Sequence, residues 1–141
     1  MKIRKFRRSD LPILCEFQKE NLEINFPDLP KNIKRFKRNL LEWSKKEPEG
    51  IKIVESEGRV IGYIWLNTKE HYGLVRHLFV MKEKRGKGIG RKLMKIAEDY
   101  FKDKNKNKVR LTVTLSNEKL VGFYKKLGYK GKRLIMERVI E

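Results

Sequence analysis

The sequence predicts a single α/β domain (α+β mixed) in which a central mixed β-sheet carries helices on both faces. Apolar residues repeat with the helical period in some segments and alternate with the strand period in others. One strand-like segment leads through a glycine-rich loop into a helix-like segment, and no repeat or linker interrupts the chain. Because 141 residues can bury a proper core, we expect residues 1–141 to form one domain.

The first third of the chain predicts one strand and two helices. Ile3 belongs to a short opening strand, and Pro12 marks the first turn of a helix over about residues 10–22. Two prolines in segment 25–30 end that helix. A second helix has a basic outer face and one apolar stripe, formed by Ile33, Phe36, Leu40 and Trp43.

The middle of the chain predicts three strands. Segments 51–55 and 60–66 have the strand pattern, and Glu57 with Gly58 forms the turn between them. A polar stretch, 67–73, separates them from a third strand over residues 74–80.

The last part of the chain predicts a long helix, a strand, a short helix and two closing strands. The long helix begins near Ile89, and segment 109–115 alternates as a strand. Asn117 caps the short helix and Gly128 ends it. With Tyr129 and segment 134–140 as strands, the expected order is β-α-α-β-β-β-α-β-α-β-β.

Composition excludes several classes of protein. The single cysteine, Cys15, cannot form an internal disulfide framework or a cysteine-based zinc site, and no metal is expected. The longest apolar runs are far shorter than the roughly 20 residues of a membrane span, so we expect no membrane partner. The basic N-terminus has no apolar segment behind it and does not resemble a secretory signal. We therefore expect a soluble protein of a reducing compartment, the cytoplasm.

The net charge is strongly positive, 36 − 18 = +18. This charge favours polyanionic partners and predicts weak, sequence-independent nucleic-acid binding. An alternative is thermal adaptation, since Lys and Glu dominate the charged residues and Gln18 is the only glutamine. That alternative explains many charges but not their imbalance. The oligomeric state, monomer or homodimer, stays open.

Three closely spaced glycines lie between a predicted strand and a predicted helix. Gly86, Gly88 and Gly90 let the backbone approach a ligand closely, and the helix start offers free N–H donors. The surrounding cations are Arg85, Lys87, Arg91 and Lys92. The loop therefore predicts a phosphate site, and a plain tight turn is the alternative.

The glycine spacing matches neither of two common phosphate-binding motifs. Arg91 replaces the third glycine of the dinucleotide-binding pattern, and no Gly-Lys pair is followed by Ser or Thr as in a P-loop. The run from Arg85 to Gly90 instead resembles the acyl-CoA signature of the GNAT superfamily of N-acyltransferases. Asn117, followed by Phe-Tyr-Lys-Lys-Leu-Gly-Tyr from Phe123, is similar to the second signature of that family. The expected order of elements also matches.

This resemblance implies a GNAT-like fold and acetyl-CoA as co-substrate. It implies that the strand over residues 74–80 separates from segment 109–115 and that the pantetheine arm pairs with its exposed backbone. Asn117 is expected near the arm, with an ordinary helix-capping role as a compatible alternative. The complete set of expected cofactor-binding residues is Leu78, Phe79, Val80, Arg85, Gly86, Lys87, Gly88, Ile89, Gly90, Arg91 and Asn117.

The resemblance also implies direct attack of an amine on the thioester. Tyr124 matches the tyrosine that protonates the departing thiolate in this family. Family members that acetylate ribosomal-protein N-termini have a glutamate where this chain has Thr112, which disfavours a simple transfer of that activity. Three side chains and water remain candidates for the general base, the side chains being Glu70, His71 and His77.

The leading hypothesis is an acetyl-CoA-dependent N-acetyltransferase that acts on a primary amine of a small molecule or protein. The alternative is a non-catalytic acyl-CoA-binding or nucleic-acid-binding module that keeps the fold. We expect segments 22–31 and 67–73 to form the walls of the acceptor pocket. The identity of the acceptor is not predicted.

Overall fold

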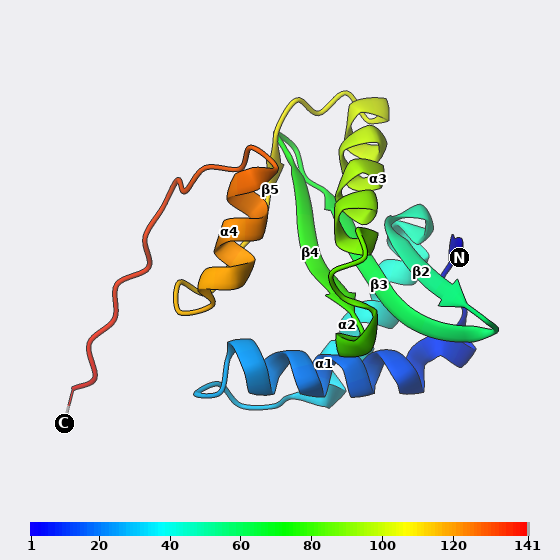
Figure 1. Cartoon of the computed structure of the whole chain (residues 1–141), viewed down its shortest axis with the longest axis horizontal. Helices are drawn as coiled ribbons and strands as arrows, with labels where there is room; N and C mark the ends of the chain where they lie inside the picture. The colour runs from blue at the N-terminus through cyan, green and yellow to red at the C-terminus, as the bar shows by residue number, and fades with distance from the viewer. Residues whose placement is uncertain (141) are drawn as a thin grey trace.

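Five strands form one sheet in their order along the chain, as Figure 1 shows in a computed structural model that describes residues 1–140. The first four strands pair antiparallel and β5 pairs parallel to β4, so the expected mixed sheet is confirmed. The strands are β1 (Lys2–Lys5), β2 (Ile51–Ser56), β3 (Arg59–Thr68), β4 (Gly73–Val80) and β5 (Val109–Arg110).

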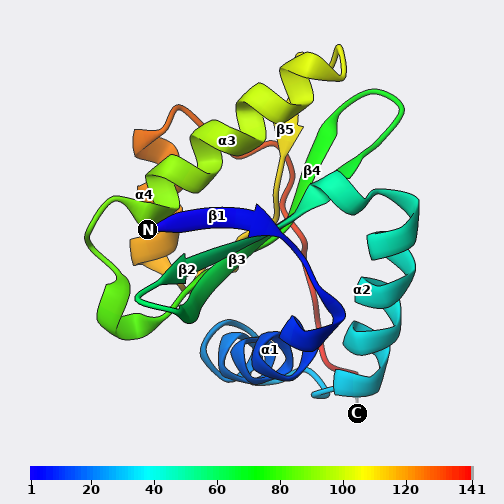
Figure 2. The same ribbon diagram turned by 90° about the vertical axis from the view of Figure 1, so that its right-hand side faces the viewer.

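Helices cover both faces of this sheet (Figure 2). One face carries α1 (Leu11–Asn25) and α2 (Ile33–Lys46), and the other carries α3 (Ile89–Asp103) and α4 (Glu118–Lys126). Three short 3-10 turns complete the order: Arg8–Asp10, Pro48–Gly50 and Lys82–Lys84. The predicted α/β class is therefore confirmed. Within residues 1–140, no helix is both long and apolar enough to cross a membrane.

The sheet separates two hydrophobic cores, and β3 contributes to both. Tyr63 and Trp65 pack under α1 and α2, whereas Ile64 and Leu66 pack under α3. Burial on both faces explains why almost all of β3 is apolar. The core thus holds the middle of the sheet firmly and leaves its β5 edge less constrained.

The main disagreement with the sequence prediction lies at the end of the chain. The expected strand over 109–115 is limited to two residues, and neither Tyr129 nor segment 134–140 forms a strand within the described residues. A strand needs a neighbouring edge for its backbone hydrogen bonds, and a two-residue β5 offers almost none. Figure 1 accordingly shows this last segment leaving the body of the fold. A strand-forming composition was thus not sufficient to make these C-terminal segments into strands.

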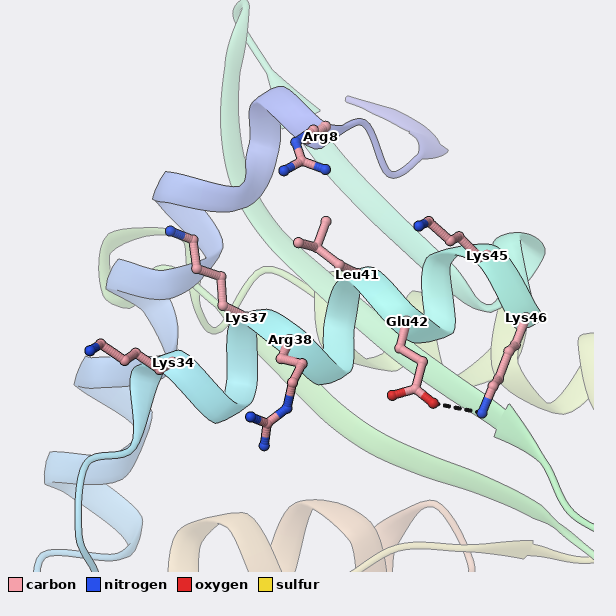
Figure 3. A pocket seen from close by; sticks show the side chains of 8 residues that line it. All are labelled: Arg8, Lys34, Lys37, Arg38, Leu41, Glu42, Lys45 and Lys46. Carbon is pink, nitrogen blue, oxygen red and sulfur yellow. Dashed lines mark hydrogen bonds and ion pairs between the residues drawn. The ribbon is translucent and has the colours of Figure 1, made fainter.

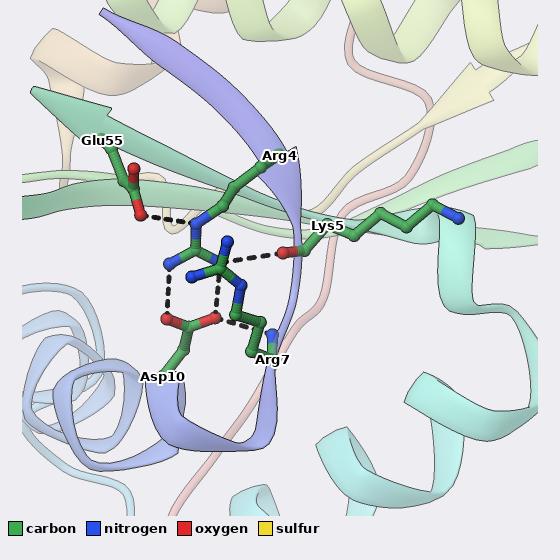
Figure 4. A network of polar contacts seen from close by, with 5 residues as sticks. All are labelled: Arg4, Lys5, Arg7, Asp10 and Glu55. Atoms are coloured by element: carbon green, nitrogen blue, oxygen red, sulfur yellow. Dashed lines mark hydrogen bonds and ion pairs between the residues drawn. The ribbon is translucent and has the colours of Figure 1, made fainter.

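A charged cluster joins the first two strands to the start of α1 (Figure 4). The Arg4 guanidinium donates to both carboxylate oxygens of Asp10, at 2.7 and 2.9 Å, and its Nε donates to Glu55 at 2.5 Å. Arg4 and Asp10 are largely buried; burial alone would raise the pKa of Asp10, but hydrogen bonds from Arg4 and from the Arg7 backbone hold it below its usual value. The cluster fixes where α1 leaves the sheet and hence where its C-terminal end lies.

Candidate active site

A cleft opens where β4 and β5 separate. The two strands pair only between Gly73 and Val109 and between Leu74 and Arg110. Within residues 1–140, the rest of this edge of β4 has no neighbouring strand. A cavity of about 740 Å³ lies at the C-terminal end of β4, between α1, the loop that follows β4, and α4. The sequence-predicted residues that line it are Leu78, Phe79, Val80, Arg85, Gly86, Gly88, Ile89, Gly90, Arg91 and Asn117.

The backbone of β4 presents hydrogen-bonding groups toward this open edge. Met81 N–H donates to the Ile61 carbonyl of β3 at 2.8 Å. Backbone groups of alternate residues point to the same side of a strand, so Phe79, two positions earlier, also directs its N–H and C=O toward β3. By the same alternation, the backbone groups of Leu78 and Val80 point to the open side. An extended ligand can pair with them as an added strand would.

The loop after β4 brings bare backbone to the mouth of the cleft. Gly86 and Gly88 have φ values of +77° and +84°, in the left-handed region that favours glycine. A Cβ atom at either position would meet no protein atom within 4 Å, so the backbone there faces open space. Gly88 is also the residue before α3, and the first N–H groups of that helix have no partner within the helix. These features fit a phosphate-bearing ligand.

Cations surround the loop, and no acidic side chain or histidine is among the cavity-lining residues. Arg85 is held in place, because its Nε donates to the Val80 carbonyl at 2.7 Å and its guanidinium lies over the Phe79 ring. Lys87 is exposed and does not line the cavity, so its expected contact with the cofactor stays a prediction. Three further cations line the cavity and were not among the expected cofactor contacts: Lys82, Lys84 and Lys119.

Asn117 connects the two sides of the cleft. Its side chain accepts a hydrogen bond from Leu120 N–H at 3.1 Å, which confirms the helix-capping role. Its amide nitrogen donates to Asn25 on α1, and Asn25 in turn donates to Asn21 at 2.6 Å. Asn25 lies in segment 22–31, which was expected to form a pocket wall, but its hydrogen bond to Asn117 and the part of Asn21 were not expected. The four-residue spacing of Asn21 and Asn25 on one helix face was the available signal for this pair.

Tyr124 lies beside the cavity but not among the residues that line it. It is buried on α4, in edge-to-face contact with Phe123, whose side of the helix does line the cavity. Burial raises the pKa of Tyr124, so its phenol keeps its proton at neutral pH. A protonated phenol close to the cleft can donate that proton.

The candidate bases do not gather at the cavity. Glu70 and His71 are exposed in the turn before β4, at the end of the strand opposite the glycine loop. His77 is packed against Phe36 on the α2 side and shares a 2.9 Å hydrogen bond with the Tyr63 hydroxyl. Burial, with a smaller effect of Arg76, lowers the pKa of His77 to about 3. A histidine that weakly basic cannot take a proton from an ammonium group efficiently.

Of the two segments expected to form the walls of the acceptor pocket, only one lines the cavity. Segment 22–31 contributes Ile24 and Asn25 to the cavity. Segment 67–73 contributes no lining residue, because it leads into the start of β4 and the cavity lies at the C-terminal end of that strand; within the segment, Asn67 is buried and accepts a hydrogen bond from Arg76. Within residues 1–140 there is no cluster of side chains that could hold a metal ion.

Comparison with known proteins gives a consistent family assignment. Residues 13–129 match the family model described as the Acetyltransferase (GNAT) family. An uncharacterized N-acetyltransferase of Methanocaldococcus jannaschii is 33% identical over 136 residues, which cover 96% of this chain and 81% of the relative. An uncharacterized N-acetyltransferase of Archaeoglobus fulgidus is 29% identical over 128 residues, covering 84% and 87% of the two chains.

Solved structures include a similar chain with a bound cofactor. The PaiA N-acetyltransferase of Thermoplasma acidophilum, in complex with coenzyme A, superposes with a TM-score of 0.76 at 25% identity. The match covers 93% of this chain and 90% of that one.

Proposed function

Since this chain belongs to the GNAT family of acetyltransferases and is an acyltransferase, we propose that it transfers an acetyl group from acetyl-CoA to a primary amine. The observation that carries the proposal is the unpaired edge of β4, which leads directly into the glycine loop at the start of α3. The coenzyme A complex of the similar Thermoplasma protein supports coenzyme A as the carrier. A single, buried cysteine also suits the reducing cytoplasm, where we place the protein.

The residues of the cleft fit acetyl-CoA in shape and charge. The backbone of Leu78 and Val80 would hold the extended arm, and the N–H groups that open α3 would hold the phosphates. Acetyl-CoA supplies the acetyl group as an activated thioester. The missing Cβ atoms at Gly86 and Gly88 allow the phosphates to approach the backbone.

The reaction forms an amide bond and breaks the thioester bond, so one proton must leave the amine and one must reach the thiolate. We assign protonation of the departing thiolate to the Tyr124 hydroxyl, which burial keeps in its protonated form. Because no carboxylate or imidazole lines the cavity, we assign removal of the amine proton to water. The cations around the cleft lower the pKa of a bound amine and so help to keep it neutral.

The proposed activity is tested by thiol release from acetyl-CoA with a panel of amine acceptors. The panel contains a polyamine, an aminoglycoside and short peptides with a free α-amino group. We expect acceptor-dependent thiol release and a product heavier by one acetyl group in mass spectrometry. Binding of acetyl-CoA without release on any acceptor would favour the non-catalytic module instead.

Water as the base leads to a prediction about pH. With the best acceptor of the panel, we expect kcat/KM to rise about tenfold per pH unit up to the pKa of the amine and then to level off. His77, with a pKa of about 3, is neutral throughout pH 5–9 and contributes no step to this profile. The variant His77→Gln should therefore show the same profile as the unaltered protein. A step near pH 6–7 that disappears in His77→Gln would contradict the assignment.

A further inference from the structure

We propose that the outer face of α2 is a docking surface for the phosphate backbone of a nucleic acid. This surface, the α2 basic face, borders an open groove of about 720 Å³ (Figure 3). Its cations are Arg8, from the turn before α1, with Lys34, Lys37, Arg38 and Lys45 from α2. The proposal is independent of the acetyl-transfer activity and concerns a face that lies outside the cleft.

Helical geometry places the α2 cations in one row. Lys34, Arg38 and Lys45 are separated by four and seven residues, so they share one side of the helix, and Figure 3 shows them spread along its length. Eleven residues separate the first from the last, which corresponds to about 16 Å along the axis. A single phosphate group is too small to contact the whole row, whereas a nucleic-acid strand presents one phosphate per roughly 3.4 Å of helix axis.

Five cations of the α2 basic face have no ion-pair partner within 4 Å among residues 1–140, although Glu42 also lines the groove and lies near enough to Arg38 for an electrostatic effect. Arg8, Lys34, Lys37, Arg38 and Lys45 are exposed, and none has a carboxylate within 4 Å among residues 1–140. Lys46, at the end of the groove, does pair with Glu42, at 2.7 Å. Elsewhere α3 shows the same arrangement, with Lys95 and Asp99 at 2.9 Å. Ion pairing for thermal stability therefore explains other lysines but not this row.

The surface favours a nucleic acid over a membrane. Helices that bind membranes place large apolar side chains beside their cations. On the α2 basic face the only apolar side chain is Leu41, which is half-buried, because Phe36 and Leu40 face the core. A row of exposed lysine and arginine side chains suits sequence-independent contact with phosphates.

The location of the α2 basic face would let a nucleic acid and acetyl-CoA bind at the same time. α2 covers the face of the sheet opposite α3, whose first turn belongs to the cleft (Figure 2). A nucleic acid on α2 would therefore leave the glycine loop free.

The test compares two variants with the same change in charge. In the first, Lys34, Lys37, Arg38 and Lys45 are all replaced by Gln. In the matched control, the four exposed lysines replaced by Gln are Lys125, Lys126, Lys130 and Lys132, which lie on or after α4 and line neither cavity. The probe is a fluorescent 20-nucleotide poly(U) RNA, with a DNA strand of equal length as a second arm, measured by anisotropy over 50–200 mM salt.

We expect the α2 variant to bind the RNA at least tenfold more weakly at 50 mM salt, and the control variant to change less than threefold. Loss of four phosphate contacts should reduce the slope of log K against log salt by about 3. An equal loss in both variants, or a larger loss in the control, would assign binding to net charge and overturn the proposal, as would no binding by the unaltered protein. The probe that binds more tightly, the RNA or the DNA strand, identifies the type of nucleic acid that the α2 basic face prefers.

Two further measurements keep the result interpretable. The thermal shift produced by acetyl-CoA should be the same in both variants, since neither change touches the cleft; it reports on the cofactor site separately from docking. If the fourfold variant does not fold, the double variant Lys34→Gln, Lys37→Gln should still reduce the salt slope by about 1.4. A double variant with an unchanged slope would refute the α2 assignment.

Discussion

The Gly88→Val variant is expected to lose nearly all of the stabilisation that acetyl-CoA gives the unaltered protein. A ligand present at 100 times its Kd stabilises the folded state by about 2.7 kcal/mol, or roughly 10 °C in Tm for a chain of this size. A valine side chain at Gly88 would project into open space beside the start of α3, where the backbone must approach the phosphates. The measurement is Tm with and without millimolar acetyl-CoA.

Gly58→Val is the matched control for this variant. Gly58 has a φ of +73°, close to that of Gly88, and a Cβ atom there also meets no protein atom within 4 Å. Both substitutions therefore impose similar backbone strain, but Gly58 lies in the β2–β3 turn and does not line the cleft. Its Tm should fall while its acetyl-CoA shift persists. A full shift in Gly88→Val, or none in the unaltered protein, would contradict the proposed phosphate site.

The Tyr124→Phe variant is expected to lower kcat by about 10²–10⁴, the usual contribution of a positioned general acid. The substitution keeps the buried ring and its edge-to-face contacts with Phe123 and Tyr129 but removes the hydroxyl. KM and the acetyl-CoA thermal shift should change little, because charge develops on the sulfur only as the bond breaks. Steady-state thiol release with the best acceptor gives both constants.

Tyr129→Phe separates this role from a general effect of removing a phenol. Tyr129 touches Tyr124, and its hydroxyl donates to Glu98 at 2.8 Å rather than lying free for chemistry. We expect its kcat to stay within about threefold of the unaltered value. Equal turnover in Tyr124→Phe and in the unaltered protein would return Tyr124 to a packing role and leave protonation of the thiolate to water.

Local patterns predicted most of the fold correctly. The apolar stripe of α2 and the glycine turn between β2 and β3 depend on neighbouring residues only, and both are present. The C-terminal strands failed because strand formation depends on an edge elsewhere in the sheet, which the alternation of residues does not reveal.

Site residues were predictable from the sequence where their role depends on the conformation of a short local motif. Gly86 and Gly88 line the cleft because their function depends on local backbone conformation. The hydrogen bond between Asn117 and Asn25 was not predictable, because the two residues are 92 positions apart in sequence. His77 was a reasonable candidate base by type, but only the packing of Phe36 on its ring shows that it belongs to the core side of β4.

The open edge of β4 gives acetyl-CoA a way to protect the folded protein as well as to serve as its co-substrate. Without a neighbour, the end of β4 next to the glycine loop is held from one side only, and such edges open more readily to proteases. Acetyl-CoA bound along this edge would extend the sheet, and at 100 times its Kd it would reduce the unfolded population about 100-fold. Degradation draws on that population. A fall in acetyl-CoA would therefore enlarge the population that is open to degradation.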